Sequence, residues 1–129
     1  MLYVGGKDKK IESFIDLYAW KEAHILALLI YKMTEKFPEK EKFGLTNQMR
    51  RAVVSVTSNI AEGFSRSSAK DKQHFYTMAR SSIAELQSQS LLARDLKYLG
   101  NDDFKQIADQ SVIASKLIVG LIKSATNKK

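Results

Sequence analysis

The stretch QMRRAVVSVTSNIAEGFSR, from Gln48 to Arg66, has the pattern of one long helix that carries a polar stripe. Its alanine, valine and isoleucine residues suit a helix that packs into a core. Ser55, Asn59 and Glu62 recur with Arg66 at spacings of four, three and four residues, which stacks their side chains along one side of a helix. The stretch therefore predicts a packed helix with a line of polar groups on it.

The rest of the chain has the same helical spacing of apolar residues and no pattern typical of strands. Pro38 ends the first helix, Ser67 or Ser68 can cap the third, and Gly100 is well placed to end that third helix. The expected helices cover about residues 16–37, 41–64, 68–99 and 101–125.

Short connections between these helices predict an all-α fold, an antiparallel up-down-up-down four-helix bundle. The length of 129 residues suits one domain. We expect residues 1–12 to form a mobile N-terminal tail, 13–126 the four-helix bundle, and 127–129 a basic C-terminal tail.

The net charge of +7 and the absence of cysteine bound the function. A basic chain is attracted to nucleic acid or to anionic lipid. Without cysteine there are no disulfides and no thiolate chemistry, which suits a reducing cytoplasm. No apolar run approaches the ~20 residues of a membrane span, and the N-terminus lacks the apolar core of a signal peptide. We expect a cytoplasmic protein without a membrane segment.

Residues that carry enzyme chemistry are sparse. His24 lies among apolar neighbours, and His74 follows Asp71 by three residues, but a di-metal bundle site needs two such pairs and further glutamates. No serine has the spacing of an activated nucleophile with its base. We therefore expect no metal, no cofactor and no enzymatic activity.

A second polar stripe on the third expected helix can meet the first if the two helices pack side by side. Polar groups at such a contact must be paired, because an unpaired buried charge costs several kcal/mol. We interpret this polar seam as structural; the alternatives are a groove in which Arg66 and Arg80 face an anion, and a solvated face. The polar seam consists of Ser55, Asn59, Glu62, Arg66, Arg80 and Glu85.

Two helical stretches are apolar around most of their circumference, namely ILALLIY at 25–31 and VIASKLIVGLI at 112–122. One bundle needs only a single apolar stripe on each helix, and surplus apolar surface usually marks a subunit interface. The sequence therefore predicts a homo-oligomer.

Basic residues gather near the expected ends of the bundle, where phosphate contacts would add together in an oligomer. No aromatic-rich platform is evident, so we do not predict base-specific binding. For each residue the alternative is an ordinary solvated charge. The candidate nucleic-acid-binding residues are Lys40, Lys42, Arg50, Arg51, Arg66, Lys70 and Lys72.

Several blocks of the chain resemble the family of 23S rRNA intervening-sequence proteins. The blocks are FGL at 43–45, NIAEG at 59–63 and ARSS at 79–82, within a resemblance that covers about residues 14–100. One departure is Ser81, where the family commonly has glycine. The resemblance implies an antiparallel four-helix bundle, and relatives assemble as pentameric rings. Relatives include reading frames inside bacterial 23S rRNA intervening sequences, and accessory proteins of diversity-generating retroelements that engage nucleic acid and a reverse transcriptase.

These observations predict a non-enzymatic, oligomeric helical-bundle protein that binds RNA or DNA through a basic surface. The alternative hypothesis is an oligomeric scaffold or adaptor that docks a protein partner. Salt separates the two, because phosphate contacts weaken steeply as ionic strength rises and apolar docking does not.

Overall fold

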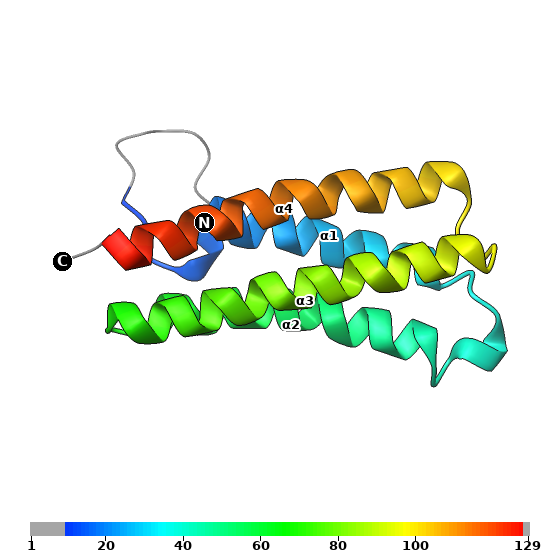
Figure 1. Cartoon of the computed structure of the whole chain (residues 1–129), viewed down its shortest axis with the longest axis horizontal. Coiled ribbons are helices and arrows are strands. Elements are labelled where there is room, and N and C mark those ends of the chain that lie inside the picture. The colour runs from blue at the N-terminus through cyan, green and yellow to red at the C-terminus, as the bar shows by residue number, and fades with distance from the viewer. Residues whose placement is uncertain (1–9, 128–129) are drawn as a thin grey trace.

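The computed structural model describes residues 10–127, and four long helices make up most of them (Figure 1). Each helix packs against its neighbours in a closed order, α1 on α2, α2 on α3, α3 on α4 and α4 on α1. The described residues contain no strand, so the predicted all-α four-helix fold is confirmed. The elements are η1 (Phe14–Asp16), α1 (Tyr18–Thr34), η2 (Glu39–Glu41), α2 (Leu45–Ser65), α3 (Ala69–Asp95) and α4 (Asn101–Asn127).

The connection between α1 and α2 is longer than the sequence pattern predicted. α1 ends at Thr34, whose Oγ1 donates to the carbonyl of Ile30 at 2.6 Å, and α2 begins only at Leu45. The short 3-10 helix η2 fills the space after Pro38. A run of some ten residues outside the long helices therefore lies at this end of the bundle.

The end of α3 differs from expectation in a second way. Lys97 has a φ of 70°, and the Tyr98 N–H donates back to the Ala93 carbonyl at 2.9 Å while the Lys97 N–H donates to that of Arg94. This is the Schellman arrangement, in which the residue after the helix adopts the left-handed conformation. The prediction that Gly100 ends α3 is wrong, because Lys97 holds that position and α4 starts directly after Gly100.

The core consists of two apolar clusters, one in each half of the bundle. The cluster nearer the α1–α2 connection includes Leu26, Met49 and Leu86, and the other includes Ile60 and Ile118. All of these side chains are fully buried. Each long helix contributes to both clusters, so both halves of the bundle are packed.

α2 and α3 approach each other closely at Gly63. A Cβ at this position would lie 2.6 and 2.8 Å from two ring carbons of Tyr76, which is itself buried. Glycine therefore sets the distance between the two helices here.

The predicted tails lie mostly outside the described residues. Residues 1–9 of the predicted mobile tail and residues 128–129 of the basic tail lie outside the described residues. From Glu12 onward the chain is held, since the N–H groups of Glu12 and Ser13 donate to Asp16 Oδ2 at 2.9 and 3.1 Å. These donors hold the pKa of Asp16 below its usual value, the Glu12 N–H foremost. Over residues 10–127, no helix has the length and apolarity needed to cross a membrane.

Candidate nucleic-acid interface

The seven candidate basic residues fall into two groups at opposite ends of α2. Lys40 and Lys42 lie on the η2 connection, with Arg50 and Arg51 in the first turns of α2, whereas Arg66, Lys70 and Lys72 flank the turn into α3 (Figure 1). α2 has 21 residues, which separates its two ends by about 30 Å. A single chain therefore carries two separate basic regions, one at each end of α2.

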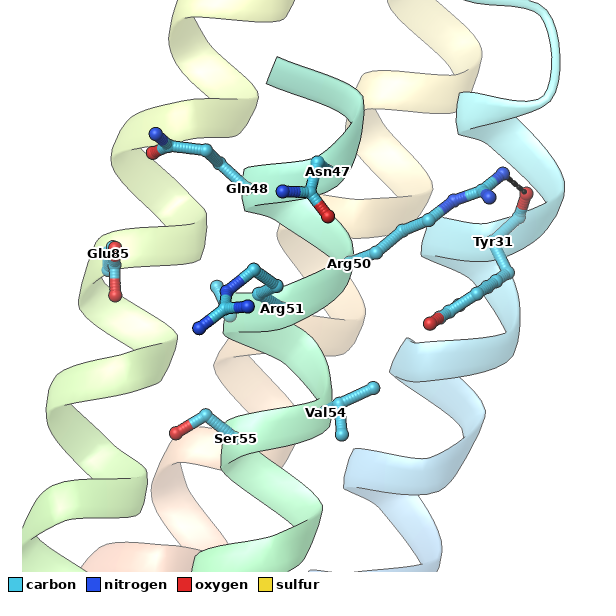
Figure 2. A pocket seen from close by; sticks show the side chains of 9 residues that line it. Tyr31, Asn47, Gln48, Arg50, Arg51, Val54, Ser55 and Glu85 are labelled. Atoms are coloured by element: carbon cyan, nitrogen blue, oxygen red, sulfur yellow. Dashed lines mark hydrogen bonds between the residues drawn. The ribbon is translucent and has the colours of Figure 1, made fainter. Parts of the chain in front are cut away.

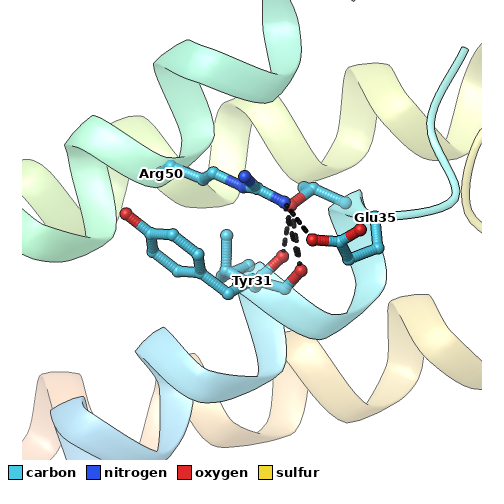
Figure 3. A network of polar contacts seen from close by, with 5 residues as sticks. Tyr31, Glu35 and Arg50 are labelled. Carbon is cyan, nitrogen blue, oxygen red and sulfur yellow. Dashed lines mark hydrogen bonds and ion pairs between the residues drawn. The ribbon is translucent and has the colours of Figure 1, made fainter. Parts of the chain in front are cut away.

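Arg50 is engaged within the protein. Its Nε donates to Thr34 Oγ1 at 2.9 Å and its Nη2 donates to the Tyr31 carbonyl at 3.3 Å (Figure 3). The same Nη2 lies 3.5 Å from a carboxylate oxygen of Glu35, and the guanidinium stands 4.6 Å from the centre of the Tyr31 ring. The last carbonyls of a helix lack partners inside that helix. Arg50 thus caps the end of α1 and ties it to α2.

Arg51, one residue further on, points the other way. Figure 2 shows its side chain extending from α2 toward α3, away from Arg50 and Tyr31. It is exposed and makes no hydrogen bond or ion pair with any other described residue. We call the open depression that it lines the Arg51 hollow, which has a volume of about 900 Å³. Its lining consists of Tyr31, Asn47, Gln48, Arg50, Arg51, Ala52, Val54, Ser55 and Glu85.

Lys40 and Lys42 are both exposed on the η2 connection. Lys42 Nζ lies 5.6 Å from the centre of the Phe43 ring, and Phe43 is 87% exposed. Sequence reasoning missed Phe43, because an apolar residue beside a glycine gives no sign of whether it will be buried. The nearby Arg51 hollow and this turn form the basic region at the α1–α2 end.

Glu41 holds this turn in place. Its Oε1 accepts from the Leu45 N–H at 3.0 Å, and its Oε2 accepts from the Tyr98 hydroxyl at 3.0 Å. These donors, the Leu45 N–H foremost, lower the pKa of Glu41. The hydrogen bond from the Tyr98 hydroxyl to Glu41 raises the pKa of Tyr98. One carboxylate therefore joins the start of α2 to the turn between α3 and α4.

At the opposite end, two of the three basic residues serve the fold. Lys72 Nζ donates to the carbonyls of Gly63 and Phe64 at 3.3 and 2.8 Å, at the C-terminal end of α2. Arg66 pairs with Glu62 at 2.6 Å and lies 4.6 Å from the centre of the Phe75 ring. Lys70 is exposed and has no ion pair within residues 10–127. This end is consequently less available to a ligand than the sequence suggested.

The polar seam is packed only in its first half. Ser55 Oγ lies 2.8 Å from Ser82 Oγ of α3, and Asn59 Nδ2 donates to the Ser55 carbonyl and hydroxyl at 2.8 and 3.0 Å. Glu62 and Arg66 are 48% and 41% exposed and pair along their own helix. The expectation that these two charges are buried in the α2–α3 contact is not met within the protomer.

The two seam residues of α3 do not share a face. Arg80 and Glu85 are five residues apart, which places them about 140° apart around the helix axis. Gln87, seven residues after Arg80 and therefore on its side of the helix, donates to Ser111 of α4 at 3.1 Å. Glu85 lines the Arg51 hollow beside α2 instead. Arg80 thus lies on the α4 side of α3 and is not part of the seam.

The two histidines pack against aromatic rings. His24 stacks on Trp20 with ring centres 4.7 Å apart, and His74 lies edge-on to Phe75. Among residues 10–127, no group of three or more histidine or carboxylate side chains is arranged to hold a metal ion.

Comparison with known proteins gives one family. A family model described as 23S rRNA-intervening sequence protein matches residues 15–120. No curated protein matches the chain. Among solved structures, the chain is similar to a protein of unknown function from the S23 ribosomal protein family of Bacteroides thetaiotaomicron, with 20% identity and a TM-score of 0.74. The match covers 81% of this chain and 95% of that one, and at this identity it shows the shared fold alone.

Proposed function

Because this chain belongs to the 23S rRNA-intervening sequence protein family, we propose that it is a non-enzymatic, oligomeric bundle protein that binds RNA or DNA through phosphate contacts. We also propose that the protein binds its nucleic acid in the cytoplasm. The single observation that carries the proposal is the unpaired Arg51 guanidinium over an open hollow, with the exposed Lys40 and Lys42 at the same end of α2.

The hollow offers donors suited to phosphate oxygens. Asn47 and Gln48 provide amide groups in the same lining as the Arg51 guanidinium, which is the side chain best matched to a phosphate. Glu85 is the acidic residue of the lining, and the charge of the chain is +7. These contacts recognise the backbone of a nucleic acid and carry no base sequence information.

Exposed apolar side chains support the oligomeric part of the proposal. Exposed leucine, isoleucine and valine residues occur on every long helix, and an interface between subunits would bury them. A ring of subunits, pentameric as in the family, would repeat the Arg51 hollow and add its phosphate contacts. The exposed residues on the long helices include Ile25, Leu28, Val54, Leu91, Leu92, Val112 and Ile113.

The same apolar surface favours a second candidate function, a scaffold or adaptor whose oligomer docks a protein partner. Such docking would bury apolar side chains, so its affinity would change little with salt. The affinity of phosphate binding, in contrast, falls steeply as the salt concentration rises.

The test is binding of purified protein to labelled structured RNA and duplex DNA between 50 and 200 mM salt, with the mass followed by light scattering. Six or more phosphate contacts per oligomer should weaken affinity by roughly a thousandfold over this range. Arg51→Ala should weaken binding and flatten the salt dependence, whereas Arg80→Ala, which removes an exposed arginine from the α4 side of α3, should change neither. No binding at 50 mM by an intact oligomer would refute the nucleic-acid proposal and leave the adaptor.

A further inference from the structure

We infer that Phe43 is a stacking site for one unpaired base, so that the α1–α2 end of the bundle prefers single-stranded nucleic acid to duplex. The inference rests on the proposed function and adds a ligand class to it. Lys40, Lys42 and Arg51 would contact the phosphates on either side of the stacked base.

Phe43 stands apart among the exposed apolar residues. The next most exposed large apolar side chain among the described residues is Leu28 at 59%, against 87% for Phe43. Burial of a phenylalanine side chain stabilises a fold by removing its apolar surface from water. Phe43 contributes almost none of this to the protomer, so its ring is available to a ligand.

The turn that carries Phe43 is held on both sides. The Lys42 N–H donates to the Glu39 carbonyl at 3.0 Å, and the Gly44 N–H donates to the Glu41 carbonyl at 2.9 Å. The Glu41 carboxylate then fixes the turn to Leu45 and Tyr98, and Tyr98 packs on the buried Phe37 with ring centres 5.4 Å apart. A ring displayed by a fixed turn loses little conformational entropy when it binds.

One cation lies beside this ring, and two more lie at the same end of the bundle. Lys42 Nζ stands 5.6 Å from the ring centre, Lys40 precedes Phe43 by three residues, and Arg51 lies in the second turn of α2, about 9 Å along the helix from Leu45. An aromatic ring among free cations is the arrangement that single-strand-binding proteins use, because every base has a face that can stack. A duplex keeps its bases stacked on one another and offers no such face.

The alternative occupant of Phe43 is a second copy of the chain. That arrangement would carry Lys40 and Lys42 into a subunit interface, where lysine is depleted because its ammonium must be desolvated. The two flanking lysines therefore favour nucleic acid over a protein surface.

The experiment compares a labelled 12-nucleotide single-stranded RNA with the matching duplex, by anisotropy at fixed low salt, for the wild-type protein and Phe43→Ala. We expect roughly 5- to 100-fold weaker binding of the single strand by Phe43→Ala, and a change of no more than about twofold for the duplex. Phe43→Trp should keep single-strand affinity, and its added fluorescence should be quenched on binding. Ile11→Ala is the control, since it removes an exposed apolar side chain that precedes α1, outside the long helices and away from the lysine pair.

Four results would overturn the inference. Equal loss of single-strand and duplex binding in Phe43→Ala, or loss of neither, would leave the proposed function standing without a stacking site. A lower oligomer mass in Phe43→Ala, with unchanged circular dichroism, would make Phe43 a subunit contact. Absence of binding by the wild-type protein to either RNA would refute the proposed function as well.

Discussion

At the scale of single residues, neighbouring positions with the same chemistry have different roles. Arg50 and Arg51 are adjacent arginines, but one caps α1 and the other lies free over the hollow. Their sequence environment is nearly the same, and only the position of α1 separates them. Sequence could nominate both residues, but it could not tell which guanidinium remains available.

Lys97 is the non-glycine residue with positive φ among the described residues, and its replacement by glycine should stabilise the fold. The left-handed conformation costs an ordinary residue about 1–2 kcal/mol, and glycine avoids this cost. Part of the gain is lost because glycine also makes the unfolded chain more flexible. Lys97→Gly should therefore raise the free energy of unfolding by about 1 kcal/mol, measured by urea denaturation. Lys97→Ala, which removes the charge and keeps the strained conformation, should not stabilise.

Glu62→Ala should change the free energy of unfolding only slightly. The loss would be severe if the seam were buried, because Arg66 would then be left without a partner. The Glu62–Arg66 pair is about half exposed, and such pairs contribute about 0.3–0.5 kcal/mol. A loss of less than about 1 kcal/mol in the free energy of unfolding is expected. A loss of several kcal/mol, with an unchanged protomer fold, would place this pair inside a subunit interface.

Acid should destabilise the protein through Glu41 and Asp16. Backbone N–H donors lower the pKa of both carboxyl groups in the folded state, from Leu45 for Glu41 and from Glu12 for Asp16. A lowered folded-state pKa means that the stabilisation is present above the unfolded-state values of about 4.5 and 3.8, and is lost as the pH falls through the folded-state values. Thermal unfolding between pH 6 and 2 should show this loss, and Glu41→Gln should reduce its size.

At the scale of elements, the periodic patterns predicted the helices well, and the ends that they missed by three or four residues are the end of α1, the start of α2 and the end of α3. Apolar spacing is a local property, and it placed all four long helices. Two of these ends depend on distant groups, since Arg50 caps the end of α1 and the Tyr98 hydroxyl donates to the Glu41 carboxylate at the start of α2. The N-cap of α3 was predicted correctly, because an N-cap needs only a local contact, and the Ser68 Oγ accepts from the Asp71 N–H at 3.0 Å.

The contact between α2 and α3 gives a prediction at this scale. Gly63→Ala would press a methyl group against the buried Tyr76 ring, and overpacking of this kind costs about 1–3 kcal/mol. We expect a net loss of about 1–2 kcal/mol after the higher helix propensity of alanine is counted. Gly120→Ala in α4 is the matched control, because nothing lies within 4 Å of its added methyl group. It should stabilise by about 0.5–1 kcal/mol in the same thermal unfolding measurement.

At the scale of the whole molecule, sequence predicted the fold class but not the surface. A four-helix bundle follows from helix number and short connections. Which cations remain free and which aromatic ring is left exposed depend on how the helices are rotated about their axes. This is why Arg66 and Lys72 were assigned to a ligand although they pair within the chain, and why Phe43 was missed.

The proposed assembly can be tested on α1. Leu28 is 59% exposed there, and Leu28→Glu would place a charge in any interface that covers this face. Light scattering of the variant should give a mass nearer to the protomer's 14.6 kDa than the wild type does. Ser67→Glu, in the exposed turn between α2 and α3, controls for one added negative charge. A wild-type protein that is already monomeric would contradict the oligomer.

The division of the core into two clusters has a consequence for how the bundle opens. Ser111, which is fully buried, and the Ser55–Ser82 bond lie at the level where one cluster gives way to the other. Each half can therefore act as a separate cooperative unit, with its own free energy of sub-global opening. Since Phe43 and Arg51 both lie on the half that contains Met49, a bound oligonucleotide should slow amide hydrogen exchange there and leave exchange around Ile118 nearly unchanged.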